Sequence, residues 1–232
     1  METSAFPFGR ALEWLLEPRD PGVRYLALRD LVTPAPPPRE LATARHEAHA
    51  AGPIATVLAA MDPAGFWEGP GPGYDPKYRS TVWSVVLLAQ LGADAREDAR
   101  VAVACDYLLA HALAPGGQFS PSGRPSGTAD CLQGNLCWAL LTLGCDPERL
   151  EPAFDWLARS VTGEGIAPRT ERTAAVRYFA AKCGPGFACG SNNGLPCAWG
   201  AIKVMRALAA WPPERHTATI RAAIEQGVAF LL

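Results

Sequence analysis

Apolar residues recur along the chain at helical spacing, three or four residues apart, and rarely alternate one by one with polar residues. Ala, Leu and Arg dominate these segments, and clusters of Pro and Gly separate them. A period near 3.6 residues is that of an amphipathic helix, whereas a half-buried strand alternates every second residue. The pattern therefore predicts an all-α protein.

Three of the apolar segments can be laid over one another without gaps, at residues 79–92, 131–144 and 197–210. Gly134 and Gly200 fall at matching positions of the last two. A short turn and a second, more charged segment follow each of them, at about 95–112, 147–160 and 214–231. We interpret the chain as repeats of one helical hairpin, each too thin to bury its apolar face alone.

The two segments of each repeat are expected in different layers, because the first is the more apolar and the second carries charges on one face. This favours an inner layer of first helices and an outer layer of second helices. A fourth, more divergent hairpin is expected near the N-terminus, with a helix at 23–31 and an outer helix at about 39–60. Glycine-containing loops follow the outer segments, and two of them end in an aromatic residue, Trp67 and Phe119.

Composition and charge narrow the class of protein. The chain of 232 residues is 49% hydrophobic and 19% charged, which is typical of a globular domain. Its net charge is -2 and its basic residues are scattered, so the basic stripe of a nucleic-acid-binding surface is missing. No segment approaches the roughly 18 apolar residues of a membrane span, and the start lacks a secretory pattern. We expect a single cytoplasmic domain over residues 1–232, with no nucleic-acid partner and no membrane span.

A loop that ends in an aromatic residue and leads into an inner helix resembles the Gln-Trp type repeats of terpenoid cyclases and protein prenyltransferases. The segments 75–83 (DPKYRSTVW), 131–135 (CLQGN) and 197–203 (CAWGAIK) resemble a group of small bacterial toroid proteins labelled prenyltransferase-like or squalene-cyclase-like. The resemblance implies an α/α-toroid, with inner and outer helices around a central cavity. The chain offers about four hairpins where a closed ring of this kind has five or more. We therefore expect a partial or open ring, which stays open, is closed by a second copy, or is a shortened form.

The chain departs from the family in its acidic motifs. It has neither the Asp-x-Asp-Asp run with which class II terpene cyclases protonate their substrate nor the Asp-Asp-x-x-Asp pattern that holds magnesium in class I enzymes. These departures argue against triterpene cyclisation by the usual mechanism. A fold does not bring a reaction with it, so the site has to supply the argument.

Four of the seven cysteines are expected to meet at one mouth of the toroid. Cys131 and Cys197 occupy equivalent positions at the starts of two inner helices, and Cys183 and Cys189 lie in the loop that leads to the second of these helices. Zinc takes thiolates tetrahedrally, and a helix N-terminus lowers the pKa of a thiol. The arrangement predicts a zinc site.

The family resemblance adds Asp130 to this site, because protein prenyltransferases bind catalytic zinc through an Asp, a Cys and a His, and Asp130 precedes Cys131. The small toroids are expected to carry a His two residues before the position of Cys197, but this chain has Leu195 there, and Cys183 is the candidate replacement. Four protein thiolates would make the zinc structural, whereas three would leave a position for substrate or water. The alternative, that these cysteines are small buried core residues, stays open.

Further candidates lie at the same end of the inner helices, where a loop enters the helix near residue 80. We expect their side chains to line a pocket together with Trp83 and Trp199, and we assign Trp138 to the core. His46 and His49 are interpreted as a solvated face of an outer helix, and Cys105, Cys137 and Cys145 as structural. The candidate catalytic residues are Asp130, Asp75, Tyr78 and Arg79, and Tyr74 is a further lining candidate.

Together these observations predict a zinc-dependent cyclase or transferase that acts on a small or lipophilic substrate in the central cavity. The alternative is a non-catalytic binding or assembly module, in which zinc or the cysteine cluster fixes the loop at 183–197 and the arc presents a surface to a partner, as solenoids do.

Overall fold

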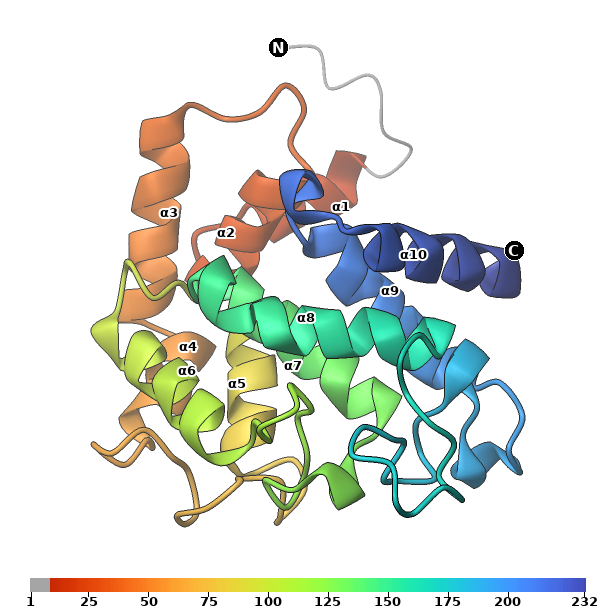
Figure 1. Ribbon diagram of the computed structural model, residues 1–232. Helices are drawn as coiled ribbons and strands as arrows, with labels where there is room; N and C mark the ends of the chain where they lie inside the picture. Colours follow the sequence, from red (N-terminus) through yellow and green to blue (C-terminus); the bar gives the residue numbers. More distant parts are fainter. Residues whose placement is uncertain (1–8) are drawn as a thin grey trace.

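The computed structural model describes residues 9–232, and this part of the chain contains α-helices and short 3₁₀ turns but no β-strand (Figure 1). The prediction of an all-α protein is confirmed. No helix between residues 9 and 232 combines the length and the apolar character that a membrane crossing needs. The helices are α1 (Gly9–Leu15), α2 (Pro21–Asp30), α3 (Pro38–Ala50), α4 (Pro53–Ala59), α5 (Thr81–Gln90), α6 (Ala99–His111), α7 (Asp130–Thr142), α8 (Pro147–Thr162), α9 (Ala198–Ala210) and α10 (Ala218–Leu231).

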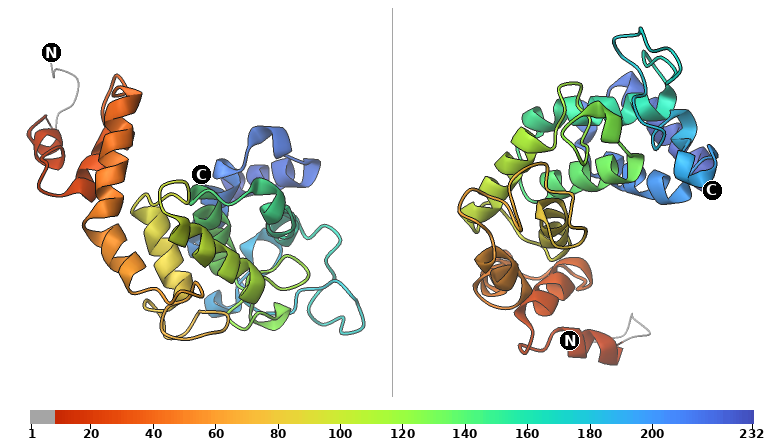
Figure 2. Two further views of the ribbon diagram at one scale, coloured as in Figure 1. Left: turned by 90° about the vertical axis from the view of Figure 1, so that its left-hand side faces the viewer. Right: turned by 90° about the horizontal axis from the view of Figure 1, so that it is seen from below.

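The repeated segments fold as three consecutive hairpins, α5 with α6, α7 with α8, and α9 with α10. The helix α7 packs between α5 and α9, while α10 packs beside α8, so that first and second helices form separate layers. Viewed from below, the hairpins follow one another along an arc (Figure 2). The loops that precede α5, α7 and α9 lie together at the lower edge of Figure 1.

Helices α7 and α9 approach each other closely because of a glycine. A Cβ placed on Gly134 of α7 would lie 2.4 Å from the carbonyl carbon of Lys203 in α9, closer than real side chains come. The matching Gly200 of α9 faces α7 with more room, since its Cβ would lie 3.4 Å from Cβ of Asp130. The two glycines that match in sequence therefore both lie at the contact between α7 and α9, but only Gly134 leaves no room for a side chain.

The repeat extends to a hydrogen bond that ties a loop to the helix after it. The backbone N–H of Trp67 donates to Oγ1 of Thr81 at 3.1 Å, and the backbone N–H of Phe119 donates to Oε1 of Gln133 at 2.6 Å. Each bond spans fourteen residues, and Thr81 and Gln133 occupy the same position of their helices. Buried N–H groups need a partner, and here the next helix provides it.

The third repeat lacks this bond. Trp199 stands where Thr81 and Gln133 stand in the earlier repeats, and fourteen residues before it lies Pro185, which has no N–H to donate. The connection from α8 to α9 is also longer than the others and covers residues 163–197. The side chain of Trp199 is 67% exposed and is free for another role.

The N-terminal hairpin differs from its prediction in one respect. The expected outer helix at about 39–60 is two helices, α3 and α4, which are separated at residues 51–52. Gly52 has a φ of 82° and Pro53 follows it, so the backbone turns at the glycine and the proline cannot donate the next helical hydrogen bond. The Gly-Pro pair therefore divides the predicted helix into α3 and α4.

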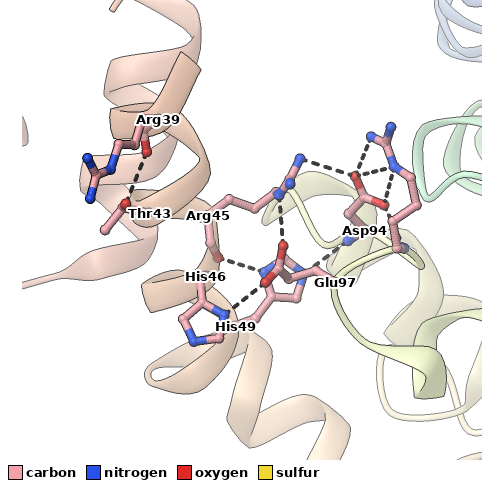
Figure 3. A network of polar contacts seen from close by, with 8 residues as sticks. Arg39, Thr43, Arg45, His46, His49, Asp94 and Glu97 are labelled. Carbon is pink, nitrogen blue, oxygen red and sulfur yellow. Dashed lines mark hydrogen bonds and ion pairs between the residues drawn. The ribbon is translucent and has the colours of Figure 1, made fainter. Parts of the chain in front are cut away.

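Polar contacts connect α3 to the turn between α5 and α6 (Figure 3). His49 is buried, and its Nε2 accepts the backbone N–H of Asp94 at 3.0 Å while its Nδ1 lies 2.8 Å from the carbonyl oxygen of Arg45. Nδ1 therefore carries the proton of a neutral ring. His46 is exposed and bonds Glu97 at 2.9 Å. The interpretation of both histidines as solvated was right for His46 and wrong for His49, because the helical period cannot show that another turn covers one side of α3.

Candidate functional site

A cavity of about 440 Å³ lies at the ends from which α5, α7 and α9 start. This volume is within the range of about 300–1,000 Å³ of small-molecule sites. Apolar and aromatic side chains form most of its wall, and polar groups enter from the loops. The wall includes Tyr74, Lys77, Tyr78, Val82, Trp83, Val86, Asp130, Cys131, Leu132, Asn135, Lys182, Cys189, Ser191, Cys197, Trp199 and Gly200.

Three of the four predicted metal ligands share this cavity. Cys131 comes from the first turn of α7, and Cys189 and Cys197 come from the segment before α9. Ala188 and Pro196 pair as an antiparallel β-bridge, so Cys189 and Cys197 lie on one face of that short ribbon. The structure thus brings three of the four predicted thiols to the ends from which α7 and α9 start.

Cys183 lies outside the cavity wall. Its thiol is buried and donates to the carbonyl oxygen of Ala180 at 3.8 Å. Burial and the nearby carboxyl of Asp130 raise the pKa of Cys183 to about 12. In the absence of a metal this thiol is protonated at neutral pH and is part of the packing of the loop.

The thiols do not form a ready metal site. Among residues 9–232, no group of three or more His, Cys, Asp or Glu side chains is arranged to hold a metal ion. Burial, followed by the charge of Asp130, raises the pKa of Cys131, which is opposite to the lowering expected from its place at a helix N-terminus. Desolvation therefore outweighs the effect of the helix dipole on the pKa of Cys131.

The carboxyl of Asp130 lines the cavity, and the fold raises its pKa toward neutral pH. Its side chain is buried yet forms part of the cavity wall. Oγ of Ser160 donates to Oδ1 of Asp130 at 3.1 Å, and the backbone N–H of Gly184 also donates to the carboxyl. Burial raises the pKa of Asp130 to about 7, against the lowering effect of these two hydrogen bonds.

The support behind Asp130 comes from two elements. Ser160 belongs to α8, and its carbonyl oxygen accepts the hydroxyl of Tyr178 at 2.8 Å. The backbone N–H of Asp130 donates to the carbonyl oxygen of Lys182 at 3.2 Å, within the parallel bridge between Ala129 and Lys182. The long connection before α9 therefore fixes the carboxyl against α8.

The catalytic candidates near residue 80 are divided by the structure. Tyr78 lines the cavity, and its ring centre lies 4.9 Å from that of Trp83. Trp83 is held in turn by a 2.8 Å bond from its indole nitrogen to the carbonyl oxygen of Tyr74. Asp75 is exposed and outside the cavity wall, and Arg79 is turned to Glu68, with which it forms an ion pair at 2.7 Å. Tyr78 stays a site candidate on geometry, and the other two do not reach the cavity.

The remaining cysteines and Trp138 are buried and pack away from the cavity. Trp138 is buried, as expected, with the guanidinium of Arg206 3.2 Å from its ring centre. Cys137 is fully buried. Cys105 and Cys145, both interpreted above as structural, lie against each other, and a hydrogen bond with Cys145, followed by burial, raises the pKa of Cys105. These thiols lie apart from the cavity.

Sequence reasoning missed two lysines of the cavity wall, Lys77 and Lys182, and the serine behind Asp130. A signal for the lysines exists, because the chain has only three lysines against eighteen arginines. No signal points to Ser160, since a serine in an outer helix has no pattern of its own. Comparison with protein-family models, with curated proteins and with solved structures found no match to this chain.

Proposed function

We propose that this chain is a small enzyme of α/α-toroid type, and that the cavity at the starts of α5, α7 and α9 binds a small lipophilic substrate for cyclisation or group transfer. The observation that carries the proposal is Asp130, a buried carboxyl in the wall of a largely apolar cavity with a pKa of about 7. A carboxyl whose pKa is raised by burial in a concave apolar site is a candidate acid–base catalyst.

The role of Asp130 follows from its proton. Near neutral pH the carboxyl is about half protonated, so it both donates a proton to a bound substrate and takes one back. Ser160 and the backbone N–H of Gly184 hold its oxygens, which fixes the direction of the remaining oxygen lone pairs. The aromatic wall of Trp83 and Tyr78 is suited to an apolar substrate, and to a positive charge that develops on it.

A lipophilic carbodiimide tests the site without knowledge of the substrate. Dicyclohexylcarbodiimide adds to protonated carboxyls in apolar surroundings, and peptide mass spectrometry locates the adduct. We expect labelling of Asp130 at pH 6, with a rate that falls about tenfold per pH unit above pH 7 as the carboxyl ionises. The exposed Asp155 of α8 is the internal control, since its carboxyl faces water.

Labelling of Asp130 that neither exceeds that of Asp155 nor changes with pH contradicts the proposal, because it would mean that no lipophilic molecule reaches a protonated carboxyl there. Replacement of Asp130 by Asn is the companion variant, which removes the adduct while the cavity keeps its shape. A variant that still gains the same mass on the same peptide overturns the assignment.

Zinc stays a prediction from the sequence and is tested separately. Metal analysis of the purified chain, combined with thiol titration, gives opposite results for a zinc site and for cysteines that bind no metal. Stoichiometric zinc with Cys131, Cys189 and Cys197 protected supports the metal site, and metal-free protein in which these three thiols react freely contradicts it. The non-catalytic alternative gains support if zinc is found and the carbodiimide does not reach Asp130.

A further inference from the structure

Each of the three lysines of the chain lines the cavity or contacts a residue that lines it. Lys77 and Lys182 line the cavity, and the ammonium of Lys203 lies 3.6 Å from the ring centre of Trp199, which lines it too. They come from three different segments, the loop before α5, the connection before α9, and α9 itself. The eighteen arginines, in contrast, are distributed over the whole chain.

The lysines also differ from the arginines in what they contact. None of the ion pairs between residues 9 and 232 includes a lysine. Nine arginines, in contrast, form ion pairs with carboxylates, and some of them, such as Arg24, pair with two carboxylates each. Lys77 and Lys203 rest on aromatic rings, the first 5.5 Å from the ring centre of Tyr74. An ammonium on an aromatic face keeps its charge available to an incoming anion, because the ring does not neutralise it.

The balance of charge in the wall points the same way. Among the residues of the cavity wall, Lys77 and Lys182 are basic and only Asp130 is acidic. A low-dielectric wall that carries a net positive charge raises the local concentration of anions. The body of the cavity, formed by residues such as Val82, Val86 and Leu132, has no such preference and accepts apolar groups.

From this arrangement we infer that the ligand of the cavity is an amphiphile with a single apolar chain and an anionic oxygen head, either a carboxylate or a phosphate monoester. Lys77, Lys182 and Lys203 bind the head at the mouth, and the apolar chain lies against Trp83 and Leu132. Lysine suits such a head because its compact ammonium binds anionic oxygens as a point charge from several directions. The inference names the substrate class of the proposed site and rests on that proposal.

Four probes with the same ten-carbon chain separate head from body: decanoate, decyl phosphate, decanol and decyltrimethylammonium. Binding is measured by isothermal titration and by tryptophan fluorescence at pH 6 and low salt, where Asp130 is mostly protonated. We expect at least one of the two anions to bind about tenfold more tightly than decanol, and the cationic probe to bind most weakly. High salt should reduce this preference, since exposed charges are screened.

Variants assign the preference to the lysines. Replacement of all three lysines by Gln should bring the anion to the affinity of decanol and leave decanol unchanged, with about a two- to fivefold loss for each lysine alone. The matched control replaces Arg100, Arg149 and Arg221 by Gln, which removes the same charge from the outer helices. If the triple lysine variant unfolds, acetylation and reductive methylation of the native chain replace it, because methylation keeps the charge and acetylation removes it.

The outcomes distinguish this inference from the proposed function. Anion and decanol binding of equal strength, or an equal loss in the arginine control, overturns the inference and leaves a neutral lipophilic site. Failure of all four probes to bind, with no carbodiimide label on Asp130, contradicts the proposed site itself. Tightest binding of the cationic probe also overturns the inference and would assign the aromatic rings as the cation-binding groups.

Discussion

The close crossing of α7 and α9 gives a prediction in which one substitution has opposite effects at two matching positions. Gly134→Ala places a methyl group 2.4 Å from a backbone carbon of Lys203, about 1 Å closer than an ordinary contact, so the two helices have to separate. Overpacking of this kind costs about 1–3 kcal/mol. The gain of about 0.5–1 kcal/mol from Gly to Ala in a helix offsets only part of it.

Gly200→Ala is the control, because its new methyl group meets Cβ of Asp130 at 3.4 Å and nothing closer. It keeps the helical gain and avoids the clash. For a chain of this length 1 kcal/mol shifts the melting temperature by about 2–4 °C. We therefore expect Gly134→Ala to lower the melting temperature by several degrees, and Gly200→Ala to leave it unchanged or raise it slightly.

Thermal unfolding followed by circular dichroism and urea unfolding measure both variants on the same scale. The reasoning is refuted if Gly134→Ala is as stable as the parent chain, since α9 would then not lie as close to α7 as the structure places it. A loss of stability for Gly200→Ala equal to that of Gly134→Ala is equally damaging. It would show that any side chain in this face is harmful, whatever the contact distance.

Three further predictions concern polar groups. Gln133→Met keeps the shape of the side chain but removes three buried hydrogen bonds, so the free energy of unfolding in urea should fall by about 3 kcal/mol or more. Thr81→Val removes one hydrogen bond and should lower it by about 1 kcal/mol. Equal losses for the two variants would contradict the role of Gln133. The folded-state pKa of Asp130 is raised from 3.8 to about 7, so the folded state binds the proton of this carboxyl more tightly than the unfolded state does. The free energy of unfolding should therefore fall as pH rises from about 4 to 7. Asp130→Asn should remove this pH dependence, and Asp155→Asn should leave it unchanged. His49→Phe leaves the buried backbone N–H of Asp94 without a partner and should cost about 1–3 kcal/mol by the same assay, whereas an unchanged value would mean that water replaces the imidazole.

Much of the fold could be predicted because the relevant information is periodic and local. The helix starts near 81, 130 and 198 and the hairpin pairing follow from apolar spacing and from the Pro and Gly clusters between the apolar segments. The break between α3 and α4 was missed, although Gly52 and Pro53 are visible in the sequence, because apolar spacing continues across them. The burial of His49 depends on a turn that lies 45 residues further along the chain.

The site was predictable only as far as the repeat reaches. Equivalent positions of the hairpins brought Cys131 and Cys197 to the same end of the molecule, and the cavity contains both. The pKa of Cys131 was not predictable, because the helix terminus is visible in the sequence and the extent of burial is not. Ser160 approaches Asp130 across the layers, and only the packing of α8 on α7 shows it.

The repeat position occupied by Thr81, Gln133 and Trp199, which binds a loop in the first two hairpins only, bears on how this chain tolerates mutation. At Gln133 the side chain holds a neighbouring loop in place, so in a saturation library scored for folded protein nearly every substitution should be depleted. At Trp199 no loop depends on the side chain, so the same library should accept many residues there. A library scored for ligand capture should reverse the order, because Trp199 faces the cavity and supports Lys203. One repeat position thus divides into a structural constraint in one hairpin and a freely adjustable recognition surface in another.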